Sequence, residues 1–132
     1  MDLARSSPIR GLLDSIAANP AADHSLAALA ERAGYSERHL TRVFTKELGR
    51  TPARYVEDVR VEAARAILET SDAPLGAVAS QVGLGSAESL RRAFAREVGI
   101  PPGAYRQRFR TTGVSGEQDP AGAGVTIAAG PA

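Results

Sequence analysis

The fold is determined by a stretch that occurs twice, as LAALAERAGYSERHLTRVFTKELGRTPARY at residues 26–55 and as LGAVASQVGLGSAESLRRAFAREVGIPPGAY at residues 75–105. Twelve of the thirty positions in the first copy are identical in the second, more than composition would give by chance. The identical pairs are Leu26 and Leu75, Ala28 and Ala77, Ala30 and Ala79, Gly34 and Gly83, Ser36 and Ser86, Leu40 and Leu90, Arg42 and Arg92, Phe44 and Phe94, Glu47 and Glu97, Gly49 and Gly99, Pro52 and Pro102, and Tyr55 and Tyr105. The repeat predicts two similar structural units.

Each copy has the layout of a helix-turn-helix unit: a short helix, a tight turn containing glycine, and a longer helix. The second copy has one extra turn residue, beside Gly85, and an insertion in a turn leaves both flanking helices intact. Apolar residues recur at helical spacing, so we expect one buried face on every helix. These faces comprise Leu26, Leu29, Ala30, Ala33, Leu40, Val43, Phe44 and Leu48 in the first copy, and Leu75, Val78, Ala79, Val82, Leu90, Ala93, Phe94 and Val98 in the second.

Residues typical of helix ends extend this pattern over the rest of the chain. A glycine follows four of the apolar stretches, and a serine, threonine or proline precedes the next one. No segment alternates with the period of a strand over a strand's length. The sequence therefore predicts an all-α fold of seven helices, at about 8–18, 26–33, 36–48, 52–70, 75–82, 86–98 and 102–110.

The expected domain runs from 8 to 110. A short lead, residues 1–7, precedes it, and we expect residues 111–132 to be a disordered tail because they are rich in Gly, Ala and Pro. Inside the domain lie the two helix-turn-helix units, at about 26–48 and 75–98.

A long central helix, at about 52–70, is expected to join the units. Nineteen residues at about 1.5 Å each give a length of roughly 28 Å. Two helices that contact one face of DNA need centres about 34 Å apart, or closer if the DNA bends. The central helix is therefore a suitable spacer, with apolar positions that we expect to pack on both units at Val56, Val59, Ala63, Ala66 and Ile67.

Composition restricts the class of protein. The chain has no cysteine, which excludes disulfides and thiolate chemistry and suits a reducing cytoplasm, where we expect the protein to be. No apolar run approaches the length of a membrane span. The net charge is only +1, but residues 36–60 carry +2 and residues 86–110 carry +4, with acidic segments between and around them.

These basic blocks place arginines on the longer helix of each unit, opposite its apolar face. The residues on this side are Arg38, Thr41, Arg42, Thr45 and Lys46 in the first unit and, at the matching positions, Glu88, Arg91, Arg92, Ala95 and Arg96 in the second. Arginine can donate two hydrogen bonds to O6 and N7 of guanine, and threonine or alanine can touch a thymine methyl group. Ser36 and Ser86, at the helix starts, can cap the helix and donate to a phosphate. The alternative is an ordinary solvated helix face, but both copies place an arginine at the same point.

The sequence from 26 to 109 resembles the DNA-binding domain of the AraC/XylS transcription regulators. The resemblance covers residues 8–110 and is most specific in the second half, at Gly83, Ser86, Phe94 and the run from Gly99 to Tyr105. It implies seven helices with two helix-turn-helix units, each inserting its longer, recognition helix into adjacent major-groove segments of double-stranded promoter DNA. The residues that match the family's base contacts are Arg38, Thr41 and Arg42 in the first unit, and Glu88, Ser89, Arg91 and Arg92 in the second. For the DNA backbone we expect contacts from Ser36, Thr45, Lys46, Ser86 and Arg96.

The resemblance also implies partners and a mode of action. Family members often regulate transcription by contacting RNA polymerase, which is therefore an expected partner. We expect an activator, with repression as the alternative. Most also carry a sensor or dimerisation domain, so this chain is either a standalone regulator or, as we slightly prefer, the C-terminal piece of a longer one. Glu88 departs from the otherwise basic surface, because a carboxylate repels phosphate although it can accept a hydrogen bond from cytosine N4. The two units therefore differ, and the DNA site is expected to be non-palindromic.

Two other classes of protein are less compatible with this sequence. An enzyme would need a catalytic constellation, and neither His24 nor His39 shares a motif with a nucleophile or a second metal ligand. We expect no catalytic residue, no metal site and no cofactor, and we expect His39 to be partly packed. A helical protein-interaction module would use the same helices without needing arginine on both, and its binding would be far less sensitive to salt.

Overall fold

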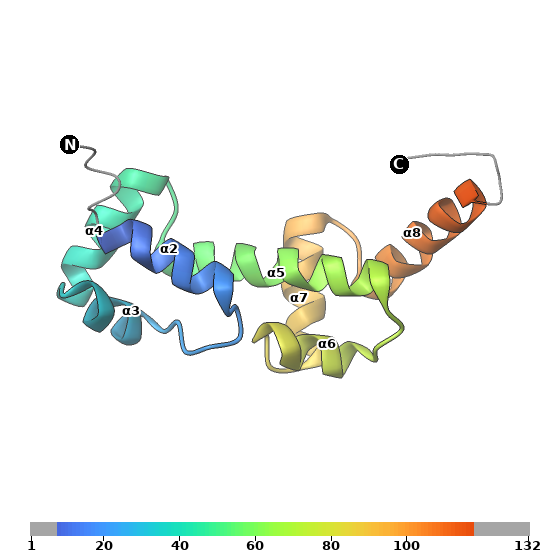
Figure 1. The fold of residues 1–132 in the computed structure, drawn as a ribbon, viewed down its shortest axis with the longest axis horizontal. Helices are drawn as coiled ribbons and strands as arrows, with labels where there is room; N and C mark the ends of the chain where they lie inside the picture. The colour runs from blue at the N-terminus through green and yellow to red at the C-terminus, as the bar shows by residue number, and fades with distance from the viewer. Residues whose placement is uncertain (1–7, 118–132) are drawn as a thin grey trace.

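The computed structural model describes residues 8–117, which form seven α-helices and no strand, as predicted. The helices are α2 (Pro8–Ala18), α3 (Leu26–Ala33), α4 (Glu37–Leu48), α5 (Pro52–Thr70), α6 (Leu75–Val82), α7 (Ala87–Val98) and α8 (Pro102–Glu117). Figure 1 shows α2, α3 and α4 gathered at one end of α5, and α6, α7 and α8 at the other. We refer to residues 8–48 as the first lobe and to residues 75–109 as the second lobe.

Side-chain caps explain why the helices begin where the sequence predicted. The Ser25, Ser36, Thr51 and Ser86 hydroxyls each accept a hydrogen bond from the backbone N–H three residues later, over 3.1–3.3 Å. Because Ser36 and Ser86 are caps, α4 and α7 begin one residue after the predicted starts. The four predicted helix-ending glycines all adopt the left-handed conformation that stops a helix.

Each lobe has its own hydrophobic core. Phe44 and Phe94 are fully buried, and each packs edge-to-face against the tyrosine that the repeat pairs with it, Tyr55 at 5.7 Å and Tyr105 at 5.3 Å between ring centroids. The first core comprises Ile9, Leu12, Ile16, Leu29, Ala30, Leu40, Phe44 and Val56; the second comprises Val61, Ala64, Leu68, Val78, Ala79, Val82, Leu90, Ala93 and Phe94. The other residues of the predicted apolar faces in the two repeats are partly buried against these cores.

The packing of α5 follows its prediction in part, because Val59 is partly buried against the first core and Ala63 and Ile67 against the second. Val56 is buried in the first core, but Ala66 is exposed, and the residues of α5 buried in the second core are Val61, Ala64 and Leu68. The helix meets the two lobes on different sides, so one straight apolar stripe does not describe it.

The last helix is longer than predicted, because α8 continues past residue 110 to Glu117. Residues 111–117, expected as part of a disordered tail, are thus helical. Extending an existing helix fixes one residue for each hydrogen bond gained, which is far less costly than starting a helix, and no proline interrupts the chain between Pro102 and Pro120. The rest of the predicted tail, residues 118–132, and the lead at 1–7 lie outside the described residues.

Candidate nucleic-acid interface

The exposed side of α4 carries the residues that the sequence singled out in the first unit. Arg38, Arg42, Thr45 and Lys46 are exposed, and Thr41 is half-buried. The Thr41 hydroxyl donates to the Glu37 carbonyl oxygen at 3.0 Å, within its own helix. Among the side chains of residues 8–109, no carboxylate forms an ion pair with Arg38 or Arg42. Both guanidinium groups are therefore available to a ligand.

The matching side of α7 is arranged differently. Arg92 donates to the Glu88 carboxylate at 3.0 Å, one turn away on the same helix. The two side chains are 65% and 71% exposed, so water competes for this pair. Arg91 is also exposed, whereas Ser89 is half-buried and its hydroxyl lies 3.2 Å from the capping hydroxyl of Ser86. The second unit thus offers an arginine that is already paired.

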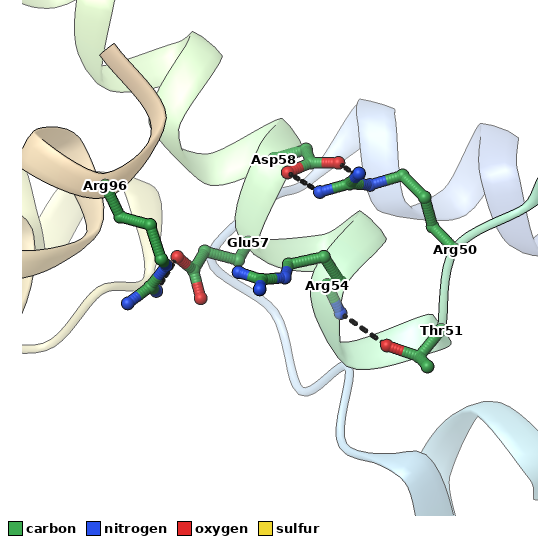
Figure 2. Close-up of polar contacts among 6 residues, drawn as sticks. All are labelled: Arg50, Thr51, Arg54, Glu57, Asp58 and Arg96. Carbon is green, nitrogen blue, oxygen red and sulfur yellow. Dashed lines mark hydrogen bonds and ion pairs between the residues drawn. The ribbon is translucent and has the colours of Figure 1, made fainter. Parts of the chain in front are cut away.

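The last turn of α7 is tied to the central helix by an ion pair that the sequence did not predict. Arg96 binds the carboxylate of Glu57, a residue of α5 that lies 39 positions earlier (Figure 2). Its side chain remains 49% exposed, so part of the guanidinium still faces solvent. Lys46, the counterpart in the first unit, makes no ion pair among the described side chains.

A second ion pair lies beside the first, where α4 leads into α5. Arg50 binds Asp58 through two guanidinium nitrogens, at 2.5 and 2.9 Å (Figure 2). Burial, reinforced by the neighbouring carboxylates of Asp58 and Glu57, raises the pKa of Glu97 to about 7. This part of the molecule therefore gathers acidic and basic groups from α5, from the end of α7 and from the residue after Gly49.

Comparison with known proteins identifies the family to which this chain belongs. A helix-turn-helix domain family model matches residues 29–108. The multiple antibiotic resistance protein MarA of Escherichia coli is 33% identical over 109 residues, which cover 83% of this chain and 83% of MarA. The chain belongs to the AraC family of transcription regulators.

Two further similarities support this AraC-family assignment. The HTH-type transcriptional regulator Rv1931c of Mycobacterium tuberculosis is 50% identical over 86 residues, which cover 65% of this chain but only a third, 33%, of that protein. The crystal structure of the DNA-binding domain of AdpA, solved in complex with a target DNA, superposes with a TM-score of 0.77 at 30% identity and covers 88% of this chain and 99% of that one.

Both histidines of this AraC-family chain contact other groups of the protein. His24 is buried, and its Nε2 lies 2.8 Å from the Asn19 carbonyl oxygen. His39 is exposed, although its ring stacks flat on Tyr35, with centroids 4.4 Å apart. No group of three potential ligands in the described part of the chain is placed to hold a metal ion. Within residues 8–117, no helix combines the length and the apolar character that a membrane crossing requires.

Proposed function

We propose that this chain is a sequence-specific DNA-binding transcription regulator that inserts α4 and α7 into adjacent major-groove segments of promoter DNA. The observation that carries the proposal is the equivalent exposure of Arg42 and Arg92, which occupy the same point of both recognition helices. An exposed arginine at the centre of a recognition helix is suited to bidentate contact with guanine.

The proposed base contacts come from the two exposed helix faces, at Arg38, Thr41, Arg42, Glu88, Ser89, Arg91 and Arg92. The Thr41 hydroxyl donates within its own helix, so we expect Thr41 to contribute mainly apolar contact and shape. The Ser89 hydroxyl accepts from Ser86 and keeps its own proton to donate to DNA. Phosphate contacts are assigned to Ser36, Thr45, Lys46, Ser86 and the solvent-facing part of Arg96. The AdpA domain, which shares this fold, is in complex with a target DNA, and this supports DNA binding by the present chain.

Selection of binding sites from a random duplex pool tests this function. We expect enrichment of one asymmetric site of roughly two helical turns, because α4 and α7 present different side chains. Enrichment of a palindrome would indicate a dimer in which each chain contributes one unit. No enrichment would contradict sequence-specific binding.

Salt dependence distinguishes this function from the alternative of a protein-interaction module. Phosphate contacts by cationic side chains such as Lys46 and Arg96 should make affinity fall with salt, with a logarithmic slope of roughly −0.9 for each phosphate neutralised. An interface between apolar protein surfaces should show little such dependence. RNA polymerase as a partner, a role in activation and a cytoplasmic location are further parts of the proposal, supported by family membership alone.

A further inference from the structure

The two lobes touch each other directly, beside the middle of the helix that joins them. The loop between α2 and α3 in the first lobe reaches the turn between α6 and α7 in the second (Figure 1). A Cβ atom placed on Gly83 would lie 2.8 Å from the Cα of Ala21 and 3.0 Å from the carbonyl oxygen of Pro20. These distances leave no room for a side chain, so the two backbones are in contact. Glycine is required there for this approach as well as for its φ of +88°.

Arg60, near the middle of α5, strengthens this contact. Its Nε donates to the Pro20 carbonyl oxygen at 2.8 Å, and its terminal nitrogen donates to the Ala22 carbonyl oxygen at 3.0 Å. The same Nε would lie 2.9 Å from a Cβ at Gly83, so Arg60 is packed between the loop and the turn. Partial burial lowers the pKa of Arg60 from its ordinary value. One side chain thus links the loop of the first lobe, the central helix and the turn before α7.

A second link holds the other end of α7. Arg96, in the last turn of that helix, binds Glu57 (Figure 2), which lies three residues before Arg60 on α5. The recognition helix of the second lobe is therefore anchored to neighbouring positions of α5 both before its start and near its end. A helix held at both ends has little freedom to pivot relative to the first lobe.

We propose that Gly83 and Arg60 are positioning residues: they fix the second recognition helix relative to the first and so determine the spacing of the two half-sites that the domain accepts. This inference rests on the proposed function, since it concerns how two recognition helices meet one DNA. Adding one base pair between half-sites moves one of them by about 3.4 Å along the duplex. A rigid pair of helices follows such a change poorly, whereas helices that pivot adapt to it.

The positioning role is testable without DNA, because the chain has no cysteine and can be labelled at introduced ones. Thr45 and Ala95 occupy matching exposed positions on α4 and α7, so nitroxide labels on T45C and A95C report the separation of the two helices by pulsed electron resonance. We expect one narrow distance distribution for this labelled protein. Gly83→Ala should broaden or shift the distribution by about one base-pair step, about 3.4 Å.

Gly85→Ala is the matched control. Gly85 has the same φ of +88° but nothing within 4 Å of its Cβ position, so the substitution introduces similar backbone strain without touching the first lobe. We expect its distance distribution to match that of the unsubstituted labelled protein. If Gly83→Ala unfolds the second lobe, Arg60→Met takes its place, because it keeps the apolar part of the side chain out to the position of Nε but removes both hydrogen bonds. Distributions that match the control's in both width and centre in every folded variant would overturn the inference.

Binding measurements then test the consequence for DNA. The bipartite site selected by the wild-type protein is lengthened and shortened by one base pair. We expect the wild type to lose about tenfold in affinity on either change, and Gly83→Ala or Arg60→Met to lose less than about threefold. A variant that keeps the wild-type spacing preference contradicts the inference while the proposed function stands. A wild-type protein with a narrow distance distribution that selects no bipartite site contradicts the proposed function and, with it, the spacing role.

Discussion

The two lobes share their cores but differ in the surfaces that we propose face DNA. Leu40, Phe44 and their counterparts in α7 are buried in both lobes, and both recognition helices begin at a capping serine. At the first position of the proposed DNA-facing side, however, the first lobe has Arg38 and the second has Glu88, which pairs with Arg92. The comparison shows that the two units share the residues that their packing requires, whereas several of their solvent-facing residues differ.

The largest expected effect tests whether the two cores are equivalent. Phe44→Ala and Phe94→Ala each leave a cavity in a fully buried site, and each should cost about 3–5 kcal/mol of folding free energy. Urea denaturation followed by circular dichroism measures this loss. Because both rings pack on a tyrosine in the same way, we expect similar values. A folded variant with unchanged stability would contradict the assignment of that core.

A smaller effect is expected on DNA binding. Arg42→Ala and Arg92→Ala should each weaken binding to the selected site by about 1–3 kcal/mol and relax the base preference at one position. We expect the larger loss for Arg42, because Arg92 must first give up its pairing with Glu88. Titration by fluorescence anisotropy on selected and random duplexes measures both the loss of affinity and the loss of base preference.

Arg10→Ala is the control for these substitutions. It removes the same charge from an exposed position of α2, outside both recognition helices, and should change affinity little. If Arg42→Ala or Arg92→Ala weakens binding to selected and random DNA equally, that arginine contacts only phosphate.

The sequence predicted the helices well because their ends depend on local chemistry. A serine cap such as Ser86 or a helix-ending glycine such as Gly99 acts within a few residues of its own position. The exposed recognition faces followed from the same helical period. The assignment of side chains to DNA bases depends on a complex of the two molecules, and it stays a prediction.

The contacts between lobes could not be predicted in this way. Arg60 binds Pro20 across 40 positions, and Arg96 binds Glu57 across 39. Helical periodicity states which side of a helix is polar, but it does not state which polar group lies opposite. Gly83 was identified as a helix end, and its second role, the close approach to Ala21, depends on the relative placement of two lobes.

The repeat pairs Glu47 with Glu97, and these two glutamates lie in different environments. This difference predicts an effect of intermediate size on folding stability. Glu47 is exposed, whereas burial beside Asp58 raises the pKa of Glu97 to about 7, from 4.5. Between these two values the folded protein binds more protons than the unfolded chain, so stability falls as pH rises through this window. Glu97→Gln, which does not titrate, should therefore stabilise the protein at alkaline pH by about 1 kcal/mol, allowing for solvent screening.

Denaturation between about pH 4 and 8 measures this effect, with Glu47→Gln as the matched control. We expect the advantage of Glu97→Gln to grow as pH rises and to level off above the pKa of about 7. Glu47→Gln should show no such growth. An advantage of Glu97→Gln that stays constant with pH would show that the pKa of Glu97 is the same in the folded and unfolded states.

The smallest expected effect on stability concerns the residue that most distinguishes the two surfaces. The Glu88–Arg92 pair is exposed and spans one helical turn, so Glu88→Ala should cost only about 0.3–0.5 kcal/mol of folding free energy. Its effect on DNA should be easier to observe. Removing a carboxylate from a surface near phosphates should strengthen binding to random duplexes, while the preference at one base of the second half-site should weaken because Glu88 no longer accepts a hydrogen bond from cytosine N4.

Arg38→Ala, at the matching position of the first lobe, should instead weaken binding to random and selected duplexes alike or relax a base preference in the first half-site. If Glu88→Ala raises and Arg38→Ala lowers the affinity for random DNA, the two recognition helices differ in charge where they face DNA. If both substitutions change this affinity in the same direction, Glu88 does not lie in the DNA interface.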